Sequence, residues 1–195
     1  GNFSFKAGFN SMRQYIHLIT NTASISPMDT WRLSDDKVVP QTGWQGSAGL
    51  YWSVFDSQVD LSLEAYYKSM KNYPDYKSGA VLTMNEKLSD ELVRTRGKAY
   101  GVEFMVKKPF GKLNGWVSYT YSRTLLQEME NRGIETINGG NWYVAAHDQP
   151  HDFKLVGNYK FTHRFSLSLD VDYKTGRPVT IPVGMYSYGG GYRFA

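Results

Sequence analysis

The chain has 195 residues and no cysteine, which excludes a disulfide framework and a thiolate metal site. It has no run of about 18 apolar residues, which excludes a helical membrane span. Its net charge is +4, but lysines and arginines are scattered rather than gathered in one stripe, so nucleic acid is not an expected partner. Tyr, Trp and Gly are frequent and the mean hydropathy is −0.47, a combination typical of a β-barrel in which every second strand residue faces lipid.

The first predicted strand covers residues 3–10. Apolar and polar residues alternate there in a strict period of two, as expected for a strand with one apolar face. The apolar positions are Phe3, Phe5, Ala7 and Phe9. The period disappears between about residues 16 and 42, which we predict to be a long loop, with Trp31 and Trp44 in this region.

The second and third strands form a predicted hairpin around residues 55–58. If Val54 opposes Val59, every apolar residue before the turn meets an apolar residue after it, as the pleat requires. Two further hairpins follow the same rule, around residues 107–112 and 162–164. We therefore predict an all-β protein, an antiparallel up-and-down meander of about seven strands.

Long polar segments separate these hairpins at residues 72–96 and 124–150. Residues 85–94 within the first of them have the composition of a short surface helix. All short turns would lie at one end of the sheet and all long loops at the other. Outer-membrane barrels sort their connections in this way, with short periplasmic turns and long extracellular loops.

The polar face of the last hairpin carries opposite charges in register. Opposing Phe161 to Phe165 places Lys154 opposite Asp172 and Asp152 opposite Lys174. Such pairs suit a hydrated lumen. A soluble lipocalin-like barrel would instead bury its apolar face, where tyrosine hydroxyls need partners. The predicted strand ends carry tyrosines that suit an interfacial aromatic girdle and favour the membrane: Tyr67, Tyr119, Tyr121, Tyr159 and Tyr173.

Several motifs resemble the C-terminal barrel of TonB-dependent outer-membrane receptors. They are RGKAYGVEF at residues 96–104, GWVSYTYS at 115–122, DQPHD at 148–152 and YKTGRP at 173–178. Their order and spacing together carry a resemblance that covers about residues 52–182. It implies a 22-stranded barrel filled by an N-terminal plug, which binds a scarce nutrient outside the cell and imports it with force from an inner-membrane partner.

The chain departs from that family pattern in its extent. About seven strands cannot close a barrel of that size, and neither a plug nor the segment that contacts the energy-coupling partner is recognisable. The last residues, 192–195, follow a glycine-rich loop and do not resemble the amphipathic final strand of such receptors. We therefore expect residues 1–195 to be one segment of a larger outer-membrane barrel, with plug and final strands outside it.

Catalytic and metal-binding chemistry is not expected. His147 and His151 have a chelating spacing only on a helix, and Pro150 interrupts them. Ser166 or Ser168 beside His163 lacks a third group that would orient the histidine. His17 and His163 are expected to be isolated loop residues. The sequence predicts no enzyme, no cofactor and no metal site.

The expected function is binding and import of a small nutrient such as a siderophore, glycan, peptide or cobalamin-like molecule. Aromatic side chains of the extracellular loops are the candidate ligand contacts, because flat rings bury a large area at small entropic cost. They are Trp31, Trp44, Trp142, Tyr143, Tyr186 and Tyr188. The alternative for these rings is packing between loops or in the interfacial girdle.

The expected partners are outer-membrane lipid, the nutrient and the TonB complex, the last through parts absent from residues 1–195, and the expected location is the cell outer membrane. Two other classes remain open at the sequence level: a soluble lipocalin-like carrier, and a passive porin or adhesin barrel.

Overall fold

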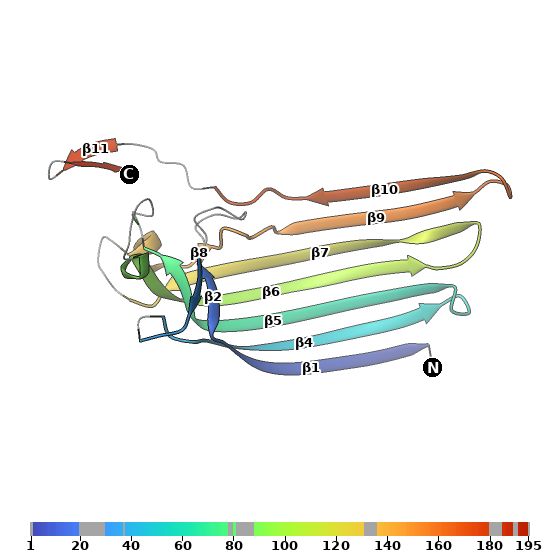
Figure 1. Cartoon of the computed structure of the whole chain (residues 1–195). Coiled ribbons are helices and arrows are strands. Elements are labelled where there is room, and N and C mark those ends of the chain that lie inside the picture. The colour runs from blue at the N-terminus through green and yellow to red at the C-terminus, as the bar shows by residue number, and fades with distance from the viewer. Residues whose placement is uncertain are drawn as a thin grey trace.

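A computed structural model describes residues 2–19, 30–36, 38–77, 80, 88–130, 136–179, 185–188 and 191–194. Its centre is one antiparallel sheet in which sequential strands lie side by side, up and down (Figure 1). The long strands, in spatial order, are β1 (Phe3–Gln14), β4 (Gln41–Val54), β5 (Val59–Tyr76), β6 (Leu92–Lys108), β7 (Leu113–Glu128), β9 (His151–Lys160) and β10 (Ser166–Lys174). The prediction of an all-β meander of about seven strands is confirmed.

Shorter elements lie at one end of this sheet. The strand β8 (Tyr143–Val144) pairs with β7, and β2 (Ile16–Ile19) pairs with β3 (Thr30–Leu33) in a small separate sheet. Two 3₁₀ turns, η1 (Leu88–Glu91) and η3 (Ile137–Gly140), belong to the long connections. None of the helical segments in the described residues is long and apolar enough to cross a membrane.

The predicted registers of the hairpins are confirmed. Val54 pairs with Val59, and Ser166 pairs with Lys160, which places Asp172 opposite Lys154 and Lys174 opposite Asp152. The three short turns meet at the end of the sheet that we call the turn end, and the long connections leave from the other, the loop end (Figure 1).

The predicted loops are too long, because strand pairing continues past the apolar rows. β5 runs to Tyr76 and β6 starts at Leu92, and these extensions pair with each other. The helix predicted for residues 85–94 is wrong where it can be checked: η1 is a single 3₁₀ turn and residues 92–94 are strand, while 85–87 lie outside the described residues. An adjacent strand that supplies backbone partners outweighs a weak helical propensity.

Two other predicted loops contain strands. Residues 16–42 were expected to be irregular, but they hold β2 and β3 and the start of β4. The strand β12 (Gly191–Phe194) pairs with β11 (Met185–Tyr188), so Tyr186 and Tyr188 belong to a strand and not to the loop in which they are predicted. Both are short antiparallel hairpins of four residues per strand, a length at which alternation is too brief to be read from sequence.

The two faces of the main sheet differ in chemistry. We call the face that carries Phe3, Phe5 and Phe9 the outer face; these side chains are 60%, 61% and 74% exposed. The opposite, inner face carries the charged and small residues, including Lys6 and Glu64. The apolar residues buried in the described part of the chain gather near the loop end: Ile19, Val38, Met70, Val93, Ala99, Leu126 and Ala145.

A bulge in β5 changes which residues face inward near the loop end. The register with β6 shifts between Met70 and Tyr73, and Asn72 adopts a left-handed φ of 57°. An extra residue at a bulge reverses the alternation beyond it. Asp75 therefore lies on the inner face, opposite the buried Val93, although strict alternation from Val59 would have placed it outside.

The close packing of β5 and β7 around Gly101 leads to a testable prediction. A Cβ there would lie 2.7 Å from Tyr66 Cε1 and 2.9 Å from the backbone oxygen of Tyr121. Because backbone cannot move away cheaply, Gly101→Ala is expected to lower the free energy of unfolding by about 1–3 kcal/mol, measured by urea unfolding of the purified protein in detergent. Gly46→Ala is the control, since nothing lies within 4 Å of its Cβ. Equal stabilities of the two variants would contradict the prediction.

Candidate ligand-contact site at the loop end of the sheet

The outer face has the dimensions of a membrane-crossing band. On β6 its successive residues are Tyr100, Val102, Phe104 and Val106, with Lys98 before them and Lys108 after them. The ten steps between the lysines span about 33 Å along a strand. A tilt of about 40° reduces this to about 25 Å, the height of the apolar band of an outer-membrane barrel.

Aromatic rings border this band near the loop end. Trp44 lies between Phe9 and Tyr67, with ring centroids 6.0 and 5.5 Å apart. On the same face, but on strands β7 and β9, Tyr119 Oη lies 2.8 Å from His151 Nδ1. Trp44 thus belongs to strand β4 and to the aromatic row on the outer face, rather than to a loop.

The inner face carries ionic contacts on the last hairpin. Lys174 Nζ lies 3.6 Å from Asp152 Oδ2, as the register predicts, and Lys154 Nζ lies 3.6 Å from the same oxygen. Lys154 is thus drawn toward its neighbour on β9, although Asp172 is its cross-strand partner in the register. The cluster leaves a polar inner face on β9 and β10.

A hollow of about 360 Å³ opens at the loop end between the β2–β3 hairpin and the inner face of β5, β6 and β7. The hairpin contributes His17 and Trp31, and the sheet contributes Lys68 and Tyr73. His147 also lines this hollow. An indole, a cation and hydrogen-bonding rings around one hollow can hold a polar, partly apolar small molecule.

His17 was expected to be an isolated loop residue, and this is wrong. It is part of β2, its side chain is 2% exposed, and its Nε2 lies 3.1 Å from Ser34 Oγ. Burial lowers the pKa of His17, so the ring is neutral at pH 7. It holds the hairpin rather than presenting a charge. Trp31, across the same hairpin, is 69% exposed and open to a ligand.

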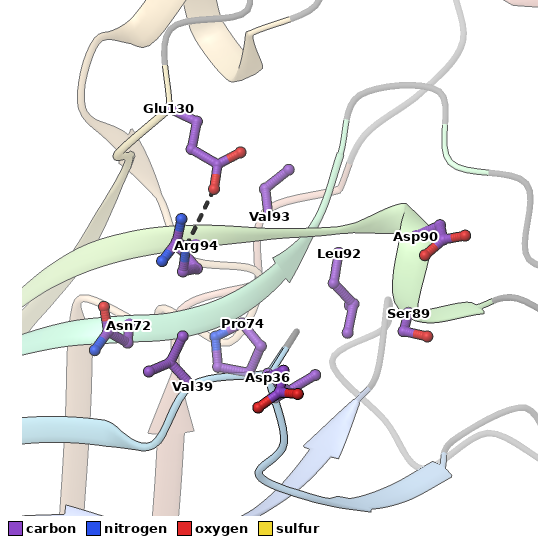
Figure 2. Close-up of a pocket in the computed structure, with 11 residues that line it drawn as sticks. Asp36, Val39, Asn72, Pro74, Ser89, Asp90, Leu92, Val93, Arg94 and Glu130 are labelled. Carbon is purple, nitrogen blue, oxygen red and sulfur yellow. Dashed lines mark hydrogen bonds and ion pairs between the residues drawn. The ribbon is translucent and has the colours of Figure 1, made fainter.

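A second hollow of about 290 Å³ lies where the bulged end of β5 meets η1 and the start of β6 (Figure 2). Its charged residues are Asp36, Asp90, Arg94 and Glu130, and Arg94 Nε pairs with Glu130 Oε1 at 3.1 Å. No group of three or more His, Asp or Glu side chains within the described residues could hold a metal ion.

Tyr143 fastens the third long connection to the inner face. Its hydroxyl donates to Asp75 Oδ2 at 2.6 Å, and the backbone N–H of Tyr76 donates to Asp75 Oδ1 at 2.8 Å. Burial raises the pKa of Asp75, although the two hydrogen bonds act in the opposite direction and lower it. Burial and the negative charge of Asp75 both raise the pKa of Tyr143. Nearby, Glu128 Oε2 accepts the N–H of Ile137 at 2.7 Å. The predicted ligand residue Tyr143 is thus engaged as an anchor.

Three other predicted ligand aromatics, Trp44, Trp142 and Tyr143, are not among the described residues that line the hollow beside the β2–β3 hairpin. Trp142 projects to the outer side, where Lys98 Nζ lies 4.2 Å and Arg96 Cζ 5.5 Å from its ring centroid. Tyr186 and Tyr188 are in β11, and their side chains lie outside the described residues. Of the candidates whose side chains the structure describes, Trp31 lines the hollow.

The structure does not bring together the histidines that could form a metal site or a catalytic pair. His147 lines the hollow, whereas His151 contacts Tyr119 in the aromatic row on the outer face. No described hydrogen bond joins His163 to Ser166 or Ser168, and Ser168 Oγ donates instead to Asn158 Oδ1. Sequence reasoning missed the buried roles of His17 and Asp75, for which the local sequence carries no signal.

An antiparallel meander with an apolar outer band, aromatic rows, a polar inner face and connections sorted by length is typical of outer-membrane β-barrels. Residues 4–195 match the family model described as TonB dependent receptor-like, beta-barrel. The chain therefore belongs to this family of outer-membrane transport receptors, which is not an enzyme family. No curated protein and no solved structure matches the chain.

Proposed function

We propose that residues 1–195 are one segment of a larger receptor barrel that binds a small nutrient at the loop end and imports it. The observation that carries this proposal is the family match over residues 4–195, on a sheet whose outer face has the height of a membrane band. Energy would come from the TonB complex through a plug outside this segment. The nutrient would be of siderophore, glycan, peptide or cobalamin type.

Supporting this orientation, the hollow and its exposed indole lie at the end of the long connections. Long connections are extracellular in outer-membrane barrels. A nutrient arriving from outside would therefore meet Trp31 first and then Lys68, which lies at the loop end of the polar inner face. Trp44, Trp142, Tyr143, Tyr186 and Tyr188 remain candidate contacts, although Trp44 and Tyr143 have partners that favour a structural role.

Location is the first requirement to test. Source cells are fractionated and blotted with an antibody against residues 72–96. The proposal expects a band far above 22.2 kDa in the outer-membrane fraction. A soluble band near 22 kDa would contradict both the membrane location and the larger barrel.

Import is tested by deleting the gene and comparing growth on iron chelates, glycans, peptides and cobalamins supplied singly. The nutrient whose use is lost is then labelled for uptake. Uptake should stop when the inner-membrane proton gradient is dissipated, while surface binding persists. Uptake that persists without the gradient would identify a passive channel, and binding without any uptake would identify an adhesin.

Trp31→Ala is expected to weaken binding of that nutrient at least about tenfold, because the ring loses its stacking area at the hollow. Affinity is measured on whole cells with the labelled nutrient, at matched receptor levels. Phe110→Ala is the control, since Phe110 is also 69% exposed but lies in a short turn at the opposite end. Equal affinity of both variants would remove Trp31 from the ligand site.

A further inference from the structure

The hollow beside the β2–β3 hairpin has charged groups of one sign. The described residues that line it include Lys68 and the imidazoles of His17 and His147, and none of them is Asp or Glu. The second hollow at the same end is the opposite case, because three carboxylates line it together with Arg94 (Figure 2). We propose that the first hollow binds small molecules that carry a carboxylate on an apolar or planar body, with the carboxylate at Lys68 and the body against Trp31.

Lys68 is half-buried and has neutral neighbours on the inner face. Its cross-strand partners are Gln45 on β4 and Ala99 on β6. The next inner-face positions on β4, β5 and β6 are neutral as well: Gly43, Ser47, Tyr66, Met70, Gly97 and Gly101. Within the described part of the chain, no carboxylate forms an ion pair with Lys68. A half-buried ammonium without an anionic neighbour favours an anion supplied by a ligand.

The acidic side chains of this region are not available to neutralise Lys68. The two oxygens of Asp75 accept hydrogen bonds from the Tyr143 hydroxyl and from a backbone N–H. Glu128 accepts a backbone N–H of η3, and neither carboxylate lines the hollow. On the inner face of β5 toward the turn end, the next acid is Glu64, four residues from Lys68. That separation is about 13 Å along a strand. A ligand carboxylate can therefore reach Lys68 without meeting a carboxylate of the described lining.

The remaining lining suits an apolar or planar body. Leu18 and Trp31 are cross-strand partners on the hairpin, and Met70 and Leu126 line the hollow from the sheet. An exposed indole gives a flat surface on which a ring can stack. A bare inorganic anion would leave these surfaces without a partner. One lysine also matches the single charge of a carboxylate better than the nearly double charge of a phosphate monoester.

The inference rests on the proposed ligand site at the loop end and narrows the nutrient that the site would take. Two sources supply the required chemistry, namely sugars that contain a uronic acid and peptides with a free C-terminus. Neutral glycans and peptides with a blocked C-terminus lack the group that would bind Lys68. We expect them to bind this hollow more weakly than their acidic counterparts.

The test uses the whole receptor, purified from outer membranes in a non-ionic detergent, with affinities measured by isothermal titration calorimetry. Two matched pairs of probes are titrated: para-nitrophenyl glucuronide against para-nitrophenyl glucoside, and glycyl-tryptophan against its C-terminal amide. In at least one pair, the acid should bind about tenfold more tightly than its neutral partner, because a hydrogen bond to a charged group contributes about that factor. The pair that shows the preference identifies the source of the carboxylate.

Lys68→Gln is expected to abolish the preference for the acid, whereas Lys68→Arg should keep it. Lys71→Gln is the matched control, because it removes the same charge three residues away on β5, from the outer face. A preference that survives in Lys68→Gln, or that is lost equally in Lys71→Gln, would overturn the inference. Equal affinity for acid and neutral probes in both pairs would also overturn it. So would competition by acetate as effective as that of the whole acid, since the apolar body would then contribute nothing.

Failure of this inference can be told apart from failure of the proposed function. If Trp31→Ala weakens binding of acid and neutral probes alike while Lys68→Gln changes neither, the ligand site stands and the carboxylate preference is wrong. If the preference depends on Lys68 but deletion of the gene affects the uptake of no nutrient, the carboxylate site stands and import is wrong.

Discussion

Leu63→Arg is expected to destabilise the barrel by about 2–4 kcal/mol, the cost of an arginine at the midplane of a bilayer on the lipid face. Leu63 lies in the middle of the outer band of β5, between Leu50 and Phe104, and its side chain is 44% exposed on the isolated sheet. In a membrane that exposed area contacts acyl chains, where a guanidinium loses its water. Urea-driven unfolding and refolding of the receptor in lipid vesicles measures this free energy.

Ser62→Arg is the matched control, one residue away and on the inner face. The alternation of the strand directs the new arginine toward the hydrated side, where Glu64 and Glu103 lie opposite each other and can form an ion pair with a cation. We expect its stability to stay within about 1 kcal/mol of the unaltered protein. A larger loss for Ser62→Arg than for Leu63→Arg would mean that the faces have been assigned the wrong way round.

Tyr143→Phe is expected to loosen the connection that carries η3 and β8. The change removes the donor to Asp75 Oδ2 and leaves a buried carboxylate oxygen unpaired, which costs about 1–3 kcal/mol. Local opening should appear as faster amide hydrogen exchange in Tyr143 and Val144, whose strand β8 rests on β7. Exchange in the centre of β6 should be unchanged.

The double variant Tyr143→Phe/Asp75→Asn provides the control for this contact. If the hydroxyl acts through Asp75, the two changes are non-additive, and the double variant opens no more than Tyr143→Phe alone. Additive effects would contradict a direct coupling between the two side chains.

The same contact has a defined pH dependence. The pKa of Asp75 is raised in the folded state by burial, so its contribution to stability is complete below the ordinary value of 3.8 and is lost as the pH rises through the raised value. Asp75→Asn removes this titration. We expect the β8 amides of the variant to be more protected than those of the unaltered protein at pH 7, after exchange rates are corrected for their intrinsic pH dependence. The variant should also lack the loss of protection that ionisation of Asp75 causes as the pH rises.

Of the other classes considered from the sequence, the soluble lipocalin-like carrier disagrees with the family to which the chain belongs. It also disagrees with the packing, because the band residues that it would bury, Phe5, Leu50 and Phe104, are all exposed on the sheet. A passive porin or an adhesin shares the barrel architecture, so the energy dependence of uptake is the measurement that separates these from an importer.

Alternation by itself determined the seven long strands, though not their ends, together with the hairpin registers and the two faces. Side chains on a strand alternate between the two faces, so a register shifted by one residue would move the apolar side chains to the polar face. This fixes the observed pairing of Val54 with Val59 and of Lys174 with Asp152. The sorting of short and long connections likewise follows from where the alternation stops. These features are local or depend on nearest neighbours, so a single sequence contains them.

Only the tertiary structure decided what happens beyond the band. The bulge at Asn72 reverses the alternation and turns Asp75 inward to Tyr143, a residue 68 positions away. His17 is buried because the β2–β3 hairpin folds back, and Trp142 faces Lys98 because β8 pairs with β7. At the loop end, each long segment has many possible pairing partners. Contacts between residues far apart in the chain leave no periodic pattern in the sequence, so the sequence alone cannot identify them.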